Sequence, residues 1–154
     1  MALDHPFDHP LDLSLDHPLA RAAFEEVRDL HVFFEAWLGG ALANTPAAFS
    51  RLDHALAETF TLVTPEGERL ARADVIDGLH AAHGARGVPF RIAIREPELL
   101  LLRPPLVVLG YVEEQTTGAT LTRRRSTALF EHHPEGHAGP LWLALHETWV
   151  APDP

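Results

Sequence analysis

PFRIAIREPELLLLR, residues 89–103, is the first of four strand-like runs in the second half of the chain. The other three are PLVVLGYVEEQTT at 105–117, LTRRRSTALFEHH at 121–133 and LWLALHETWVAP at 141–152. Turns that contain Pro or Gly separate the runs, as is typical of antiparallel strands. We therefore expect one sheet of long antiparallel strands in this half.

The first half of the chain carries helical patterns instead. From Leu19, apolar residues recur at spacings of three and four until Gly39 and Gly40 stop the pattern, which predicts one long amphipathic helix. Asp16 is the expected N-cap of this helix, with Pro18 in its first turn. The apolar positions of the pattern are Ala23, Val27, Leu30, Phe34, Trp37 and Leu38.

Two further helices and one strand follow before the main run of strands. Thr45 and Pro46 open a second, shorter helix, and residues 72–83 form a third that stops at Gly84. Between them, ETFTLVT at 58–64 predicts a strand, with PEGERL at 65–70 as its turn. Helices first and strands after, without alternation, indicate an α+β domain with helices laid on one face of a curved sheet.

Composition limits the classes of function. The 154 residues, 46% of them hydrophobic, suit one soluble domain, and the formal net charge of −10 disfavours binding to nucleic acid. All 12 basic residues are Arg and the chain has no Cys, which excludes thiolate nucleophiles, zinc–sulfur sites and Schiff-base chemistry. No signal segment or membrane span is recognisable, so a cytoplasmic protein is expected.

The N-terminal residues 1–17 are predicted to form an extended arm, and residues 18–151 a single domain. Asp-His-Pro occurs three times in the arm, where each Pro prevents a regular helix. The arm either binds a metal through its His and Asp side chains or lies on the body or on a partner subunit. We favour the second interpretation, because metal ligands need a fixed geometry.

The order of these elements resembles the nuclear transport factor 2-like fold, a cone-shaped, cystatin-like fold with three N-terminal helices on a curved, mixed and mainly antiparallel sheet. The resemblance rests on FFEAWLGG at 33–40, FTLVTPEGERLARADVIDGLHAAHG at 60–84, YVEEQ at 111–115, RRSTALF at 124–130 and LWLALHETW at 141–149. That superfamily includes the SnoaL-like polyketide cyclases and the ketosteroid isomerases, and the chain is most similar to its uncharacterised bacterial SnoaL-like families. The resemblance implies a fold and no particular reaction. The ketosteroid isomerase residues have no match here, since that family's oxyanion Tyr comes from the first helix and Tyr111 lies on a predicted strand.

Alternation along the last three strands sorts their side chains onto two faces, provided that they form regular hairpins about residues 116–121 and 133–140. The first face is apolar at one end and polar at the other, and the first helix should cover it. An apolar floor with a few convergent polar groups is typical of a small-molecule pocket. The predicted ligand-binding residues are Phe34, Trp37, Tyr111, Arg124, Glu147 and Trp149.

Glu113 is the predicted catalytic residue on that face, and His146, on the second face, is the alternative general base. Glu113 and Glu147 flank Arg124, and crowding with partial burial separates the pKa values of such carboxyl groups. Glu113 or His146 would move a proton while Arg124 and Tyr111 hold a carbonyl or its oxyanion. This chemistry, of isomerase, cyclase or dehydratase type, needs no cofactor.

Other interpretations stay open. The three charged side chains could form only a cross-strand ion network, and His146 could be merely hydrogen-bonded. We expect the second face of the sheet to form the interface of a homodimer. The chain could instead be a non-catalytic dimerisation or interaction module whose cone is filled by its own Trp and Phe side chains. No metal site is predicted, because His80 and His83 on the third helix lack further ligands.

Overall fold

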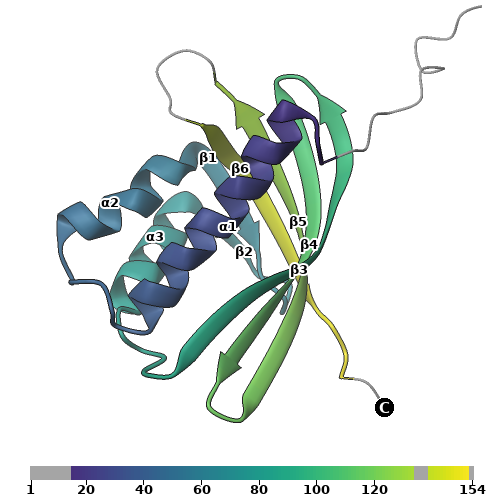
Figure 1. The fold of residues 1–154 in the computed structure, drawn as a ribbon. Helices are drawn as coiled ribbons and strands as arrows, with labels where there is room; N and C mark the ends of the chain where they lie inside the picture. The colour runs from purple at the N-terminus through teal and green to yellow at the C-terminus, as the bar shows by residue number, and fades with distance from the viewer. Residues whose placement is uncertain (1–14, 134–138, 153–154) are drawn as a thin grey trace, which may run out of the picture.

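The computed structural model of the protein describes residues 15–133 and 139–152. Within these residues, the helices α1 (Pro18–Leu38), α2 (Pro46–Ala55) and α3 (Arg72–Ala81) lie on one face of a six-stranded sheet (Figure 1). The strands are β1 (Leu56–Val63), β2 (Arg69–Ala71), β3 (Phe90–Arg103), β4 (Leu106–Thr117), β5 (Thr120–His132) and β6 (Pro140–Trp149). The predicted α+β architecture of three helices on a mixed sheet is confirmed.

The sheet has the strand order β2-β1-β6-β5-β4-β3. β1 lies parallel to β6, and every other pair of neighbours is antiparallel. β2 is a correction, since Arg69 and Leu70 were expected to belong to the turn at 65–70. The turn is shorter: the Thr64 N–H donates to the Glu68 carbonyl over 2.8 Å, so the next residues extend and pair with β1.

The long helix α1 follows its predicted pattern and turns an apolar face to the sheet. Its N-cap is His17 rather than Asp16, because the Nδ1 atom of His17 accepts from the backbone N–H of Leu19 over 3.2 Å. At the other end, the Gly39 N–H donates to the Glu35 carbonyl over 3.0 Å and closes the last turn. The buried residues of the helix are Ala20, Ala23, Val27, Leu30, His31, Phe33 and Trp37.

The hairpin registers match the alternation argument with one exception. Glu113 lies opposite Arg124 in β4–β5, and Ser126 lies opposite Glu147 in β5–β6, as regular hairpins require. The exception is Trp142, which strict alternation would place on the second face with His146. The β5–β6 pairing slips between Leu129 and Phe130, so Leu143 is an extra residue in β6 and Trp142 turns toward the core.

Residues 1–14, most of the predicted N-terminal arm, and residues 134–138 lie outside the described residues. Among the helices that are described, none is long and apolar enough to cross a membrane.

Candidate functional site

A cavity of about 350 Å³ lies between the helices and the sheet. Aliphatic and aromatic side chains from every layer make up most of its wall: Leu30, Phe34, Leu52, Leu56, Phe60, Trp142 and Leu145. Its exposed lining residues, Asp74, Gly78, Ala85 and Arg86, belong to α3 and the segment after it, and they mark the mouth. This volume and lining suit a small, largely apolar molecule.

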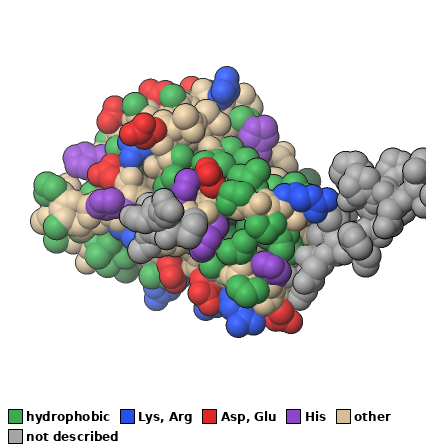
Figure 2. Space-filling view, turned by 90° about the horizontal axis from the view of Figure 1, so that it is seen from above, with side chains coloured by type: hydrophobic (Ala, Val, Ile, Leu, Met, Phe, Trp, Pro, Cys, Tyr) green, Lys and Arg blue, Asp and Glu red, His purple; other side chains and the backbone are tan. Residues whose placement is uncertain are grey.

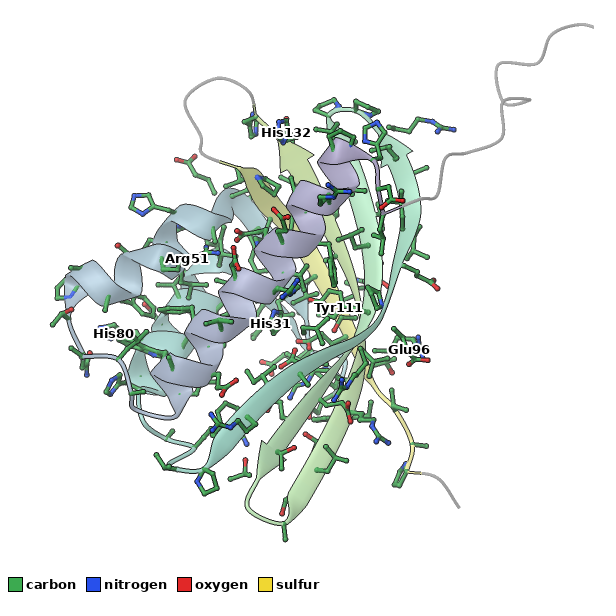
Figure 3. All side chains as sticks on the ribbon, viewed as in Figure 1. His31, Arg51, His80, Glu96, Tyr111 and His132 are labelled. Atoms are coloured by element: carbon green, nitrogen blue, oxygen red, sulfur yellow. The ribbon has the colours of Figure 1, made fainter. Side chains whose placement is uncertain are left out.

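Behind Asp74 and Arg86 at the mouth, five further polar side chains line the cavity, and they come from four elements. His31 is on α1, Glu113 and Gln115 are on β4, Arg124 is on β5 and Glu147 is on β6. Residues two apart on a strand face the same side, and the observed registers place the β4, β5 and β6 members side by side. The long helix then brings His31 over them, and Figure 3 shows His31 on the side of α1 that faces the strand of Tyr111.

His31 and Glu113 form a buried ion pair. The Nε2 atom of His31 lies 3.1 Å from Glu113 Oε2, and its Nδ1 atom lies 2.6 Å from the Val27 carbonyl oxygen. A carbonyl oxygen only accepts, and an ionised carboxylate does too, so both ring nitrogens donate and His31 is an imidazolium. Burial alone would lower the pKa of His31, but the hydrogen bond and the charge of Glu113 outweigh it and raise the pKa above 6.5.

Glu113 stays ionised throughout the neutral range. Burial alone would raise its pKa, but the hydrogen bond and charge of His31, together with the charge of Arg124, lower it to about 2. The second carboxylate oxygen accepts from Nε2 of Gln115 over 2.6 Å. Both oxygens of Glu113 are therefore engaged, and its negative charge is fixed.

Glu147 behaves in the opposite way although it lies in the same cavity. Its side chain is 7% exposed, and this burial, together with the nearby charge of Glu113, raises its pKa to about 7 against the opposing charge of Arg124. The hydrogen bond from Arg124, which opposes this rise in the pKa of Glu147, is long, at 3.4 Å from Arg124 NH1 to Glu147 Oε2. Glu147 is thus a carboxyl group that gains and loses a proton near neutral pH.

Arg124 separates the two carboxyl groups in the sheet. Its guanidinium carbon lies 5.0 Å from the centre of the Trp149 ring, which covers one face of the group. Its Nε atom is buried and has no hydrogen-bond partner in the described part of the chain. Arg124 therefore retains donor capacity beside the cavity.

Four of the predicted site residues line the cavity: Phe34, Glu113, Arg124 and Glu147. His146 does not, because it is exposed on the opposite face of the sheet, opposite Thr127. The sheet separates His146 from a molecule in this cavity, so the cavity gives no support to His146 as a general base.

Three further residues predicted to bind a ligand, Trp37, Tyr111 and Trp149, are not part of the cavity lining. Trp37 is buried deeper, where its indole N–H donates to the Leu79 carbonyl over 2.7 Å and joins α1 to α3. Tyr111 is buried behind the polar cluster, and burial raises the pKa of its phenol well above 10. Trp149 is 44% exposed and donates to Glu66 over 3.2 Å.

Sequence analysis missed His31, Gln115 and Trp142. His31 lies four residues after Val27 on the apolar face of α1, a position that marks a polar side chain held in the core. Gln115 follows Glu113 by two residues, so the alternation of side chains along the strand places both on the same face and could have identified Gln115 as a site residue. Trp142 was missed because no sequence signal marks the extra residue in β6.

His80 on α3 and His83 in the segment after it take part in packing. His83 donates from Nε2 to the Leu42 carbonyl over 2.6 Å, and His80 packs edge-on against Phe49. Figure 2 shows histidines spread over one end of the molecule rather than gathered in one place. In residues 15–133 and 139–152, no group of three or more His, Cys, Asp or Glu side chains could hold a metal ion.

Comparison with solved structures gives the superfamily. No protein-family model and no curated protein matches the sequence. A solved NTF-2 like protein of unknown function from Pseudomonas aeruginosa matches with a TM-score of 0.76 and 28% identity, over 84% of this chain and 99% of that chain. The chain belongs to the NTF2-like superfamily.

Other NTF2-like structures match at lower identity and support the fold alone. The CaMKII hub of S. rosetta has a TM-score of 0.67 at 12% identity, over 84% of this chain and 95% of that chain. A ketosteroid isomerase-like protein from Shewanella frigidimarina has a TM-score of 0.62 at 11% identity, over 82% of this chain and 94% of that chain. The NTF2-like fold thus occurs in proteins named for assembly and in one named for catalysis, and the site itself must argue for the function.

Proposed function

We propose that the protein binds a small, largely apolar organic molecule in the cavity and moves a proton on it without a cofactor. The observation that carries this proposal is the pair of carboxyl groups beside Arg124, whose pKa values are about 2 for Glu113 and about 7 for Glu147. Two carboxyl groups whose environments separate their pKa values in this way suit different roles in acid–base chemistry. An isomerase, cyclase or dehydratase type of reaction, as in the SnoaL-like proteins that the sequence resembles, would use them.

The two carboxyl groups divide the work. Ionised Glu147 takes a proton from a carbon next to a substrate carbonyl, and the developing oxyanion is stabilised by the guanidinium of Arg124. Glu147 then returns the proton to another atom of the same molecule, so that no outside acid or base is consumed. Glu113 keeps its charge throughout, because His31 and Gln115 hold it, and that charge keeps the pKa of Glu147 near neutral.

Proton exchange on a simple ketone tests the proposal before the natural substrate is known. Benzyl methyl ketone is apolar, fits the size of the cavity, and exchanges its methylene protons in deuterium oxide at a rate that NMR follows. We expect the protein to accelerate this exchange above the buffer rate, and Glu147→Gln to remove about a hundredfold or more of the acceleration.

Glu114→Gln is the matched control. It replaces a glutamate by glutamine, as Glu147→Gln does, but Glu114 lies on the outer face of the sheet, away from the cavity, where it pairs with Arg95 and Arg123. This variant should keep the full exchange rate. An unaccelerated exchange with the wild-type protein, or full activity in Glu147→Gln, would contradict the proposal.

Self-association through the outer face of the sheet is a second proposed function, compatible with the first. Thr127 and His146 are paired across β5 and β6 and are both exposed at the middle of that face, beside Leu129 and Ala144. The CaMKII hub among the structural neighbours is consistent with self-association. The cavity of about 350 Å³ argues against the version of this hypothesis in which the interior is filled and only association remains.

Light scattering coupled to size-exclusion chromatography tests the association. We expect a homodimer for the wild-type chain and a monomer for Thr127→Arg, because a long cation at the centre of the interface would have no partner there. A wild-type monomer at micromolar concentration would rule out this dimer.

A further inference from the structure

Arg124 is a buried cation whose pairing inside the protein is incomplete. Its side chain is only 16% exposed, yet its contact with Glu147 is 3.4 Å long, compared with about 2.7–2.9 Å for a strong charge-assisted hydrogen bond. Its Nε–H has no acceptor among the residues that the structure describes. The ring of Trp149 shields one face of the guanidinium from water.

The charges around the cavity explain what Arg124 lacks. His31 and Glu113 neutralise each other at 3.1 Å, and Gln115 occupies the other oxygen of Glu113. Among the described residues, Glu147 is the carboxyl group that Arg124 contacts directly, and Glu147 is neutral for much of the time near pH 7. A partly buried guanidinium without a counter-charge is costly, so an oxyanion that enters the cavity gains a strong partner.

We propose that the cavity accepts a small apolar organic acid, whose carboxylate pairs with Arg124 and whose hydrocarbon part packs against Phe34, Trp142 and Leu145. The proposal rests on the proposed function only in using the same cavity as a binding site. Neutral Glu147 donates its proton to the bound carboxylate, whereas ionised Glu147 repels it. Binding of the acid is therefore linked to protonation of Glu147.

Other charged groups around Glu147 set the background for this linkage. His31 faces it from α1, Glu113 and Tyr111 from β4 and Arg124 from β5, while Asp74 and Arg86 lie at the mouth. Of the groups closest to Glu147, Glu113 stays ionised above pH 4 and Tyr111 stays neutral below pH 10. His31, whose pKa is raised from 6.5, is retained in Glu147→Gln, so changes in binding between pH 6.5 and 8.5 that disappear in this variant report on Glu147.

Calorimetric titration with phenylacetate and with phenylacetamide tests the charge preference on molecules of equal size. Hexanoate and hexanamide serve as an aliphatic pair, so that the shape of one ring does not decide the result. At pH 6.5 we expect each acid to bind at least tenfold more tightly than its amide. Raising the pH to 8.5 should weaken acid binding about tenfold and leave amide binding unchanged.

Three variants identify the groups responsible. Arg124→Gln should bind acid and amide equally, and retained amide binding shows that its cavity is still formed. Arg125→Gln, the neighbouring exposed arginine on the outer face, should keep the preference for the acid. Glu147→Gln should keep the preference and lose the dependence on pH.

The proposal is overturned if the amides bind as tightly as the acids, if neither pair binds, or if Arg124→Gln keeps the preference. These results are separable from those of the exchange experiment. If acids bind but exchange on benzyl methyl ketone is not accelerated, the acid-binding proposal stands and the proposed proton transfer fails. If exchange is accelerated but acids are not preferred over amides, the proposed proton transfer stands and the acid-binding proposal fails.

Discussion

His31 donates from Nε2 to Glu113 Oε2 across 3.1 Å, in surroundings where the two residues are 4% and 6% exposed. The residues are 82 positions apart in sequence, so this bond joins the middle of α1 to the middle of β4. It fixes the charge of one carboxylate in the cavity, and through that charge it affects the other. The ion pair thus links the packing of the long helix to the electrostatics of the candidate site.

Replacing one member of this pair should cost much more than replacing both. His31→Leu leaves the Glu113 carboxylate buried without its cation, which we expect to lower the free energy of unfolding by about 3–5 kcal/mol. The double variant His31→Leu/Glu113→Leu removes both charges and should recover part of that loss. Urea unfolding of the wild type, both single variants and the double variant at pH 7 measures the coupling. Strict additivity of the two losses would show that no such pair contributes.

Glu147 should make the protein less stable as the pH rises. Its pKa is about 7 in the folded protein and 4.5 for the free group, so the folded state binds the proton more tightly. The stabilisation from this group is therefore complete below pH 4.5 and is lost as the pH rises through 7, by about 3 kcal/mol in all. His31, whose pKa is also raised, adds loss in the same direction.

Glu147→Gln isolates that contribution, because the variant retains His31 and cannot ionise at position 147. Relative to the wild type, it should gain stability between pH 5 and pH 8.5, by up to about 3 kcal/mol. Urea unfolding of both proteins at a series of pH values gives the difference directly. A difference that stays constant over this range would mean that Glu147 is ionised in the folded protein throughout.

The same group should set the pH profile of proton exchange. Exchange on benzyl methyl ketone needs ionised Glu147 as the base, so the rate should rise with pH through about 7 and then level off. Glu113, with a pKa of about 2, should leave no inflection above pH 4. A rate that rises with a midpoint near pH 4 would assign the base to a carboxyl group with an ordinary pKa.

Much of the site could be predicted from the sequence because strand alternation is a strict geometric rule. Once two hairpins are assumed, Glu113, Arg124 and Glu147 must lie on one face, and the structure has them there. The rule fails at Leu143, where one extra residue in β6 shifts Trp142 to the core side of the sheet. The sequence could not predict this shift, because a bulge leaves no mark in the pattern of apolar residues.

The pKa values could not be predicted in the same way. Glu113 and Glu147 have similar sequence surroundings, each close to polar or aromatic residues on a strand. Their pKa values differ because α1 crosses over the sheet and places the hydrogen bond of His31 on Glu113 rather than on Glu147. That contact depends on the angle and distance between a helix and a sheet, which periodicity along the chain does not contain.

The cavity should be the place where small molecules bind, and filling it tests this without changing any charge. Leu145 lines the cavity next to the polar cluster, and Leu145→Phe adds volume inside it. Because the added ring enters space that is already empty, unfolding free energy should change by less than about 1.5 kcal/mol. Phenylacetate should bind at least tenfold more weakly, and exchange on benzyl methyl ketone should slow in parallel.

Leu143→Phe, two residues earlier on the same strand and outside the cavity lining, is the matched control and should leave both properties unchanged. Equal binding by Leu145→Phe and the wild type would move the site away from this cavity.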